Sequence, residues 1–355
     1  MKIFRNFMII MIIALLVFIV INQMSSSPEE VVREAKPHFD EEEETIESKG
    51  TVAELPQMNL EGDLYQWIGK TSTELTEELG EPDRIDVSAY NYEWYVYNNS
   101  ETQYGQFAVL DDEIISVYAI GEDLETAPID SGEDYTEVAD TFPFSNEVTY
   151  SKGDASFTFR LNEEDLQTRP LVKISDTMFI QFYFDTITET LSSMRITTGD
   201  ALLSQRPYEI EYRGELPEQP AFSEEEWRDI QEGMEQQIFD ISNIMRDQHD
   251  LPQLEWDDQV SLVAYDHSKD MYENDYFSHD SLDGDGLKER LEERQVAYVA
   301  AGENIAAQYP DAPAAMEGWL NSESHREALL SDEYSYLGVG VYRFYYTQNF
   351  LGKPF

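Results

Sequence analysis

The chain has 355 residues, which is too long for one ordinary domain and suits two domains of about 100 to 200 residues each. Its 23 Lys and Arg against 73 Asp and Glu give a formal net charge of −50, which argues against a nucleic-acid partner and against basic attachment to anionic lipid. A hydrophobic content of 41% and an aromatic content of 13% exclude a disordered acidic polymer, and the lack of cysteine excludes disulfides, a thiolate nucleophile and a cysteine metal site.

The excess of acidic residues has two interpretations. A solvated, self-repelling surface keeps a protein soluble in a salty or alkaline setting. A surface of the same charge also attracts cations and repels acidic partners. Composition leaves both open, and a cysteine-free chain is compatible with a place outside the cytoplasm without requiring one.

An apolar stretch opens the chain, where Lys2 and Arg5 precede the uninterrupted apolar run from Phe7 to Ile21. As a helix this run spans about 22 Å, short of the roughly 30 Å of a bilayer core, and flanking apolar residues can extend it. Positive charge before such a run predicts that the N-terminus stays in the cytoplasm and that everything after it is exported. We therefore expect residues 1–24 to be a single-pass signal anchor, with a cleaved signal peptide as the alternative.

Residues 25–55 have the composition of an acidic, disordered tether. A Ser-Ser-Ser-Pro sequence starting at Ser25 breaks any helix, and the acidic run from Asp40 to Glu44 repels itself and extends the chain. His38 lies in this stretch and is interpreted as a bystander. The first folded domain is therefore expected to begin at about residue 56.

Residues 56–205 are predicted to form an α+β domain of short helix and antiparallel meander units. A helix is expected over Thr73–Leu79 and ends at Gly80. Aromatic and β-branched segments between turns predict the strands. The first three are Tyr92–Tyr97, Gln106–Leu110 and Ile114–Ile120. A weaker pattern of the same kind predicts three more, Ala155–Phe159, Met178–Phe184 and Leu191–Thr197, and is interpreted as a possible two-fold repeat. The region has no histidine and no catalytic spacing, so it is expected to serve packing or recognition.

Residues 206–221 are rich in proline and are predicted to be a linker to a second domain, residues 222–355. Ser223 and Glu226 have the spacing of a capping box at the start of an amphipathic helix. Apolar spacing predicts further helices over Asp257–Glu273 and Ala312–Asn321, and strands over Leu337–Tyr342 and Tyr345–Phe350. Helices with strands closing the chain predict a sheet covered by helices.

Three of the five histidines, His267, His279 and His325, lie in the second domain within an ordered set of short motifs. The motifs are Ala264–Met271, Tyr276–His279, Gly302–Ala306, Gly318–Arg326, Leu337–Tyr342 and Tyr346–Phe350. In this order they resemble the CAP superfamily (cysteine-rich secretory proteins, antigen 5 and pathogenesis-related 1 proteins), in its bacterial SCP-like branch. The first domain, with its Gly-x-Pro and aromatic-strand pattern, resembles the CAP-associated N-terminal domain of Gram-positive surface proteins.

The resemblance implies an α-β-α sandwich with an open cleft, lined by two histidines and two acidic residues that often hold a divalent metal. Carried over by position, His279, Glu303 and His325 line this cleft, with Asn304 beside them. Two imidazoles and a carboxylate leave the fourth position of a zinc-like ion to water. The expected cofactor is therefore zinc or another divalent cation on His279, Glu303 and His325.

The second acid of the cleft is ambiguous. The family often places it three residues after the helix tryptophan, Trp319, and here that position is Ser322. Glu323 is the neighbouring acid, turned about 100° around a helix from Ser322. Both positions are kept as candidates for the cleft.

Several other sites are interpreted as structural. His267 is expected to be a buried, hydrogen-bonded packing residue, and Asp283 to Gly286 are expected to form a turn, since they lack the ligand spacing of a calcium loop. The chain has no His-Glu-x-x-His, Gly-x-Ser-x-Gly or Gly-x-x-x-x-Gly-Lys sequence. Standard zinc-protease, serine-hydrolase and phosphate-loop chemistry are thereby disfavoured.

The function expected from these patterns is a binding or interaction module of the cell envelope, anchored by its N-terminal helix and displayed outside the cell, or secreted if that helix is cleaved. Its ligand is expected to be a lipid, a peptide or a wall component. The alternative is a metal-assisted hydrolase in which Glu303 acts as base, with His279 and His325 at the metal. The absence of a catalytic activity shared across the family favours binding.

Overall fold

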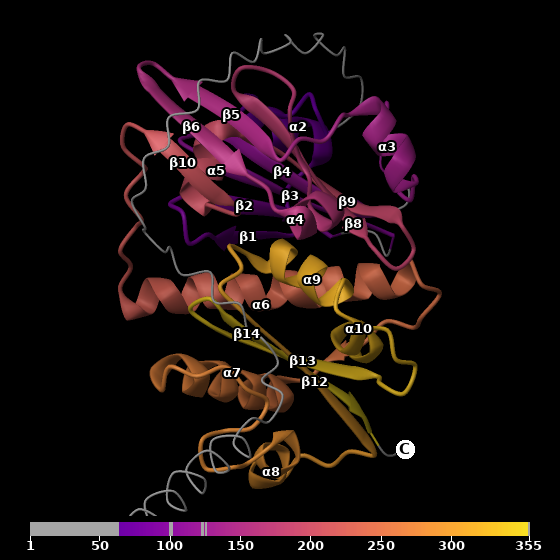
Figure 1. Cartoon of the computed structure of the whole chain (residues 1–355). Helices are drawn as coiled ribbons and strands as arrows, with labels where there is room; N and C mark the ends of the chain where they lie inside the picture. The colour runs from indigo at the N-terminus through magenta and orange to yellow at the C-terminus, as the bar shows by residue number, and fades with distance from the viewer. Residues whose placement is uncertain (1–63, 99–101, 122–123, 125, 354–355) are drawn as a thin grey trace, which may run out of the picture. The chain divides into compact units, whose positions relative to one another are not determined.

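The computed structural model describes residues 64–98, 102–121, 124 and 126–353 (Figure 1). They form a mixed α+β fold, as the sequence predicts. The membrane helix predicted at 1–24 and the tether predicted at 25–55 lie outside the described residues. Within the described part, the structure contains no helix that is both long and apolar enough to cross a membrane.

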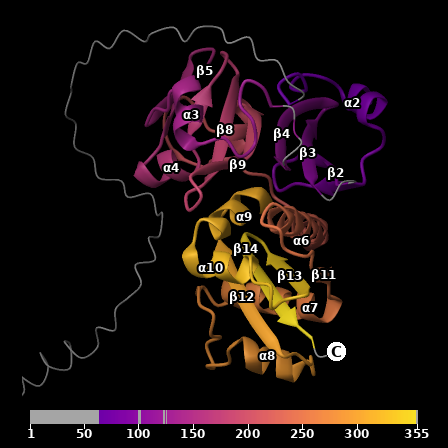
Figure 2. The same cartoon turned by 90° about the vertical axis from the view of Figure 1, so that its right-hand side faces the viewer.

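The first domain is built on a seven-stranded antiparallel sheet with the order β1-β2-β3-β4-β9-β8-β7 (Figure 2). The strands are β1 (Arg84–Val87), β2 (Glu93–Tyr97), β3 (Gln103–Leu110), β4 (Glu113–Gly121), β7 (Leu171–Lys173), β8 (Met178–Asp185) and β9 (Thr190–Thr198). The predicted first helix is α2 (Ser72–Leu79). Thr71 and Glu74 form a capping box at its start, and Gly80 is its C-cap. Gly80 has a φ of 86°, a conformation that glycine adopts without strain.

The two predicted groups of strands meet in this one sheet because β4 pairs with β9. The second group is not a separate meander, however. Its first strand, β6 (Ala155–Arg160), lies in a three-stranded sheet between β5 (Glu147–Lys152) and β10 (Glu209–Arg213). β10 falls in the segment predicted as a linker, where Ile210 packs against a buried cluster that includes Phe159. The helices between these strands are α3 (Tyr135–Thr141), α4 (Glu163–Thr168) and α5 (Gly199–Gln205).

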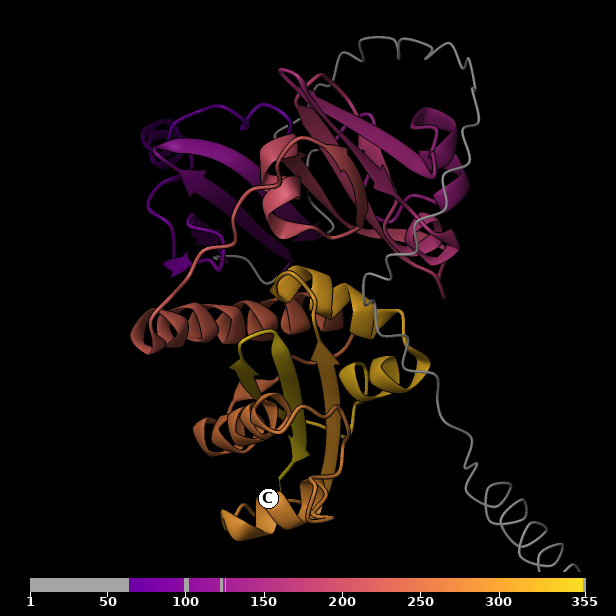
Figure 3. The ribbon, with the colours of Figure 1, turned by 60° about the vertical axis from the view of Figure 1, so that its left-hand side comes forward.

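The second domain is the predicted α-β-α sandwich. Its sheet has the order β11-β13-β14-β12, with α6 and α9 packed on one face and α7 and α8 on the other (Figures 1 and 3). The strands are β11 (Glu255–Trp256), β12 (Ala300–Ala307), β13 (Tyr336–Tyr342) and β14 (Tyr345–Gly352). The helices are α6 (Glu224–Asp247), α7 (Asp258–Glu273), α8 (Leu287–Glu293), α9 (Ala312–Leu320) and α10 (Glu323–Leu329). The capping box of Ser223 and Glu226 is confirmed at the start of α6.

Glycine in β13 lets α7 lie directly on the sheet. A Cβ atom at Gly340 would be 1.9 Å from the backbone nitrogen of Tyr265, and one at Gly338 would be 2.3 Å from that of Ser261. The three apolar residues that alternate with these glycines, Leu337, Val339 and Val341, face α6 and are fully buried. The alternating Gly and apolar pattern therefore sets the positions of both helix layers.

Both domains contribute to one hydrophobic cluster. Trp94 and Tyr118 of the first domain belong to the same buried set as Ile238 and Trp319 of the second. Ion pairs between arginine and aspartate also cross this boundary, among them Arg84 with Asp240 at 3.0 Å, Arg195 with Asp311 at 2.8 Å, and Arg326 with Asp185 at 2.8 Å. The described residues of the two domains accordingly belong to one compact unit.

Candidate functional site

The structure brings together the three residues on which the predicted cleft depends. His279 follows α7, Glu303 lies in β12 and His325 lies in α10. Nδ1 of His279 is 3.0 Å from Oε1 of Glu303, and the rings of His279 and His325 have centroids 6.3 Å apart. The side chain of His279 is 54% exposed and that of Glu303 is 5% exposed. The site is therefore an exposed imidazole and a half-buried one beside a buried carboxylate.

Glu303 is held by more than the histidine. Nη2 of Arg290, in α8, donates to Oε2 of Glu303 over 2.6 Å. Asn349, the partner of Glu303 across the β12–β14 ladder, donates to the same oxygen over 3.0 Å with its amide nitrogen turned toward the carboxylate. Burial by itself raises the pKa of Glu303, but the His279 hydrogen bond and the Arg290 charge outweigh it, so this pKa is lowered. Glu303 is thus an ionised carboxylate whose two oxygens are both engaged.

This contact fixes the tautomer of His279. An ionised carboxylate only accepts hydrogen bonds, so Nδ1 of His279 carries the proton. In the neutral ring, Nε2 is then the atom with an available lone pair. A carboxylate that orients a histidine in this way is the usual arrangement behind an imidazole that binds a metal or a donor group.

Residues 68–208 match the family model described as CAP-associated N-terminal, and residues 239–352 match that of the cysteine-rich secretory protein family. The chain is 44% identical over 349 residues to an uncharacterized membrane protein, YlbC, of Bacillus subtilis, and the match covers 98% of each chain. The chain belongs to the CAP superfamily. Both halves of the predicted resemblance are thereby confirmed.

Two solved structures are similar to the CAP protein over most of its length. An extracellular protein containing an SCP domain from Bacillus anthracis superposes with a TM-score of 0.78 at 41% identity, covering 87% of this chain and 100% of that one. A cysteine-rich secretory protein from Staphylococcus aureus has a TM-score of 0.72 at 27% identity and covers 84% of this chain and 97% of that one. These similarities extend across both domains.

The other predicted residues lie around this centre in different roles. Asn304 is fully buried on the opposite side of β12 from Glu303, and its amide donates to the backbone oxygen of His325 over 3.0 Å. Ser322 is the N-cap of α10 and makes no side-chain cap hydrogen bond. Glu323 is exposed in the first turn of α10. Asn304 therefore supports the segment that carries His325, and the ambiguity between Ser322 and Glu323 stays open.

The first domain reaches the segment that carries His325. Oδ1 of Asn321 accepts hydrogen bonds from the backbone nitrogen and the hydroxyl of Thr186, both at 2.8 Å, and its nitrogen donates to the oxygen of Phe184. On the other side of His325, Arg326 pairs with Asp185 at 2.8 Å. The β8–β9 turn of the CAP-associated domain thus holds both flanks of one cleft histidine.

The carboxylate of the predicted metal site already has partners within the protein. Both oxygens of Glu303 serve His279, Arg290 and Asn349, so the carboxylate does not face outward as a third ligand. Among the residues that the structure describes, there is no group of three or more His, Asp or Glu side chains that could hold a metal ion. The metal predicted on His279, Glu303 and His325 stays a prediction.

Arg290, Asn349 and Asn321 were not identified from the sequence. Arg290 lies in α8, a helix that no pattern in the sequence predicts, and Asn349 lies in the Tyr346–Phe350 motif, which assigns it no role. Asn321 is predicted only as the end of a helix. Its hydrogen bond with Thr186, 135 residues away in the β8–β9 turn, leaves no pattern in the local sequence. A polar residue directly opposite Glu303 in the ladder was the signal available for Asn349.

Proposed function

We propose that this CAP protein is an externally displayed, membrane-anchored binding module of the cell envelope. The charged and apolar pattern of residues 1–24 supports the anchor, and one relative is described as a membrane protein while a similar structure is of an extracellular protein. The expected ligand classes are a lipid, a peptide or a wall component.

The convergence of His279, Glu303 and His325 carries the proposal that the cleft is the binding centre. The buried carboxylate of Glu303 orients the exposed ring of His279, and the ring of His325 lies beside it. This arrangement is suited to binding a polar group of a ligand between the two rings. The same geometry makes Glu303 a poor general base. A base works best with a pKa near the operating pH, whereas the pKa of Glu303 is lowered and both its oxygens are engaged. Binding is therefore favoured over metal-assisted hydrolysis.

Binding is tested with the full-length chain and a His279→Ala/His325→Ala double variant. Each is mixed with purified peptidoglycan, with phospholipid vesicles and with a peptide library, and the bound fraction is measured by co-sedimentation or fluorescence. The proposal expects one of these three classes to bind the parent at least 10-fold more tightly than the double variant. Equal binding by both proteins, or none by either, would contradict the role of the cleft.

A divalent metal at the two imidazoles remains a proposal with its own test. Zinc that binds only the folded state raises the melting temperature of the full-length chain. The rise is expected in the parent and in a His38→Ala control, and is expected to be lost in the His279→Ala/His325→Ala variant. A rise of equal size in the double variant would place the zinc elsewhere.

Display outside the cell is tested separately. Protease added to intact cells is expected to digest the folded domains while a cytoplasmic marker stays whole, and washing with high salt is expected to leave the protein on the membrane fraction. Recovery of the protein in the culture medium would instead indicate a cleaved N-terminal segment.

A further inference from the structure

The sheet of the CAP domain ends in a strand with one unpaired edge. In the order β11-β13-β14-β12, β12 is the last strand, so only its β14 side is paired within the sheet (Figure 1). An unpaired edge presents N–H and C=O groups that another extended chain can use. Since Glu303 lies in β12, this edge belongs to the cleft for which a binding role is proposed above.

The register of the sheet shows which backbone groups of β12 point outward. One step beyond the last pair of the β12–β14 register, Gln308 donates its backbone N–H to the oxygen of Phe344 over 2.8 Å. Residues of an antiparallel pair alternate between turning both backbone groups toward the partner strand and turning them away from it. Even-numbered residues of β12 therefore face β14, and Ala301, Glu303 and Ile305 turn their N–H and C=O groups outward.

These outward groups are covered at one end of the strand and open at the other. Nε1 of Trp319, in α9, donates to the backbone oxygen of Ile305 over 3.0 Å, which closes the edge at that point. The outward groups of Ala301 and Glu303 have no such partner in the described part of the chain. Glu303 as a whole is half-buried although its side chain is only 5% exposed, so its accessible surface belongs mainly to its backbone. The open part of the edge is therefore Ala301–Glu303.

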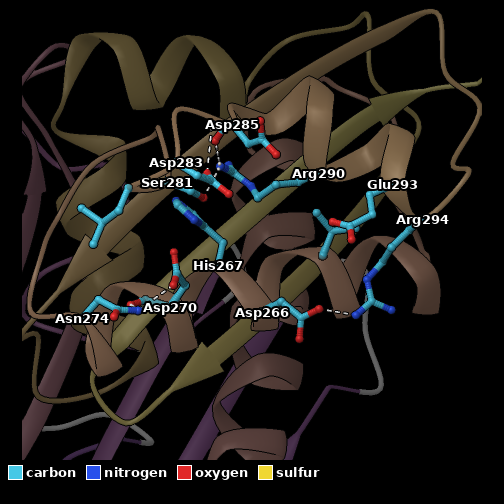
Figure 4. A pocket seen from close by; sticks show the side chains of 12 residues that line it. Asp266, His267, Asp270, Asn274, Ser281, Asp283, Asp285, Arg290, Glu293 and Arg294 are labelled. Carbon is cyan, nitrogen blue, oxygen red and sulfur yellow. Dashed lines mark hydrogen bonds and ion pairs between the residues drawn. The ribbon is translucent and has the colours of Figure 1, made fainter.

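Arg290 fixes the flank of this edge on the α8 side of the sheet. Its Nη2 pairs with Glu303, and its Nη1 donates to the backbone oxygens of His279 and Asp285 over 2.9 and 3.1 Å. Figure 4 shows the Arg290 side chain reaching from α8 to the loop that contains Ser281 and Asp285. The ring of His279 stays more than half exposed beside Glu303. A chain that lies along Ala301–Glu303 has this ring on its α8 side.

The flank on the opposite face of the sheet is acidic. Gly302 faces this side, where a Cβ atom would lie 2.5 Å from the hydroxyl of Tyr334. Burial and the charges of Glu333 and Glu327 raise the pKa of Tyr334, so both carboxylates lie near that hydroxyl. Both glutamates are exposed, and neither carboxylate makes an ion pair with a residue that the structure describes. A basic side chain beside Gly302 would meet two acids that have no positive partner.

We propose that the Ala301–Glu303 edge of β12 binds an extended peptide as an added strand, with a basic side chain of the peptide directed toward Glu327 and Glu333. A peptide backbone repeats N–H and C=O groups at the spacing of the outward groups of β12, which a lipid chain does not. Successive side chains of a strand point to opposite faces, so the neighbours of the basic residue face His279. The inference rests on the proposed function, because it names a peptide as the ligand of the same cleft.

The test uses a fluorescein-labelled hexapeptide, Thr-Lys-Thr-Lys-Thr-Lys, and two isomers of it that are N-methylated either at every Thr or at every Lys. Alternate residues of a strand turn their N–H groups to the same side, so only one isomer loses the N–H groups that face β12. Fluorescence anisotropy with the full-length chain is expected to show saturable binding of the unmethylated peptide. One isomer is expected to bind at least 10-fold more weakly and the other to stay within 3-fold. Hydrogen exchange of the Ala301 and Glu303 amides is expected to slow when the peptide is bound.

Variants of the chain provide a second test. Ala301→Pro removes one outward N–H, and proline is tolerated in edge strands where that group faces solvent. The variant is therefore expected to keep the melting temperature of the parent within a few degrees and to bind the peptide at least 10-fold more weakly. Glu327→Gln/Glu333→Gln is expected to weaken binding at least 3-fold. The matched control, Glu225→Gln/Glu232→Gln, carries the same change of charge on exposed positions of α6 and is expected to stay within 2-fold.

Several outcomes overturn the inference. They are equal binding of the two methylated isomers, equal losses in the two double variants, and no binding of the peptide. Protection of the Ala301 and Glu303 amides that rises with the concentration of the free protein also overturns it, because a second copy of the chain then occupies the edge. Binding of vesicles or peptidoglycan that depends on His279 and His325, without binding of the peptide, removes this inference and leaves the proposed function standing.

Discussion

The cleft and the boundary between the domains each contain a buried glutamate, and the two behave in opposite ways. Glu303 in the cleft is surrounded by Arg290, His279 and Asn349, and its pKa is lowered. Glu317, in α9 at the boundary, is 4% exposed and accepts hydrogen bonds through Oε1 from Ser193 at 2.5 Å, Ser192 and Tyr118. Burial raises the pKa of Glu317 to about 7, and these hydroxyl groups offset only part of the effect.

The difference shows that the partner, and not the depth of burial, decides the charge of a buried carboxylate. A guanidinium compensates an ionised carboxylate, whereas hydroxyls satisfy a neutral one nearly as well. The cleft therefore keeps its carboxylate charged beside the exposed ring of His279. The boundary holds a carboxylate that changes charge near neutral pH, and it also holds the ion pair of Arg195 and Asp311.

The largest effect is expected from breaking that pair with Arg195→Met. The guanidinium of Arg195 is fully buried, lies 2.8 Å from Asp311 and also binds Gln205. Its removal leaves a buried carboxylate without compensation, which costs about 3–5 kcal/mol in the free energy of unfolding. Urea unfolding measures this loss.

Lys152→Met serves as the matched control, because Lys152 pairs with Asp200 where both side chains are more than half exposed. Exposed pairs contribute about 0–1 kcal/mol, so this variant is expected to unfold almost as the parent does. Similar losses in the two variants would mean that the boundary between the domains is not sealed from water.

A pH-dependent effect of about 3 kcal/mol is expected from Glu317. Its pKa is about 7 in the folded chain against an ordinary value of 4.5, so between these two pH values the folded state retains a proton that the unfolded state has released. The contribution of Glu317 to the free energy of unfolding therefore falls by about 1.4 kcal/mol per pH unit between pH 4.5 and about pH 7. It is constant below and above these two pH values. The Glu317→Gln variant lacks this loss, so its stability relative to the parent is expected to rise between pH 5 and pH 7.5.

The measurement is urea unfolding of both proteins at intervals of half a pH unit. Taking the difference between the two cancels the pH dependence that the many other acidic residues contribute. A difference that stays flat from pH 5 to pH 7.5 would mean that Glu317 is charged throughout and has found a positive partner.

The same comparison separates what the sequence could predict from what it could not. The capping box of Ser223 and Glu226 and the alternating glycines of β13 are local patterns, and each has a direct structural consequence. The approach of His279 to Glu303 followed from motif order, because that order carries the topology of a known family. The environment of Glu317 depends on Ser193, which lies 124 residues away in the other domain. No local pattern in a single sequence predicts a contact between residues so far apart in the chain.

A loss of about 2 kcal/mol is expected from Arg290→Gln at the cleft. The substitution removes the charge beside Glu303, while the hydrogen bonds from His279 and Asn349 remain, so the loss is smaller than at Arg195. A double-mutant cycle with Glu303→Gln isolates the pair, and the two changes together are expected to cost clearly less than their sum. Strict additivity would show that Arg290 stabilises the loop through its bonds to the backbone oxygens of His279 and Asp285 instead.

The smallest effect, about 1 kcal/mol, is expected from Asn321→Ala, and its informative readout is local. The variant loses the hydrogen bonds to Thr186 and Phe184 through which the first domain holds one flank of His325. Hydrogen exchange of the backbone amides of residues 322–326 is expected to accelerate, while that of β12 around Glu303 stays unchanged. Asn274→Ala, which loses its two hydrogen bonds to Asp270 at the C-terminal end of α7, is the control and is expected to leave residues 322–326 as slow as in the parent. If Asn321→Ala also leaves them slow, the first domain does not order this side of the cleft, and the position of His325 is set by α9 and Asn304 within the CAP domain alone.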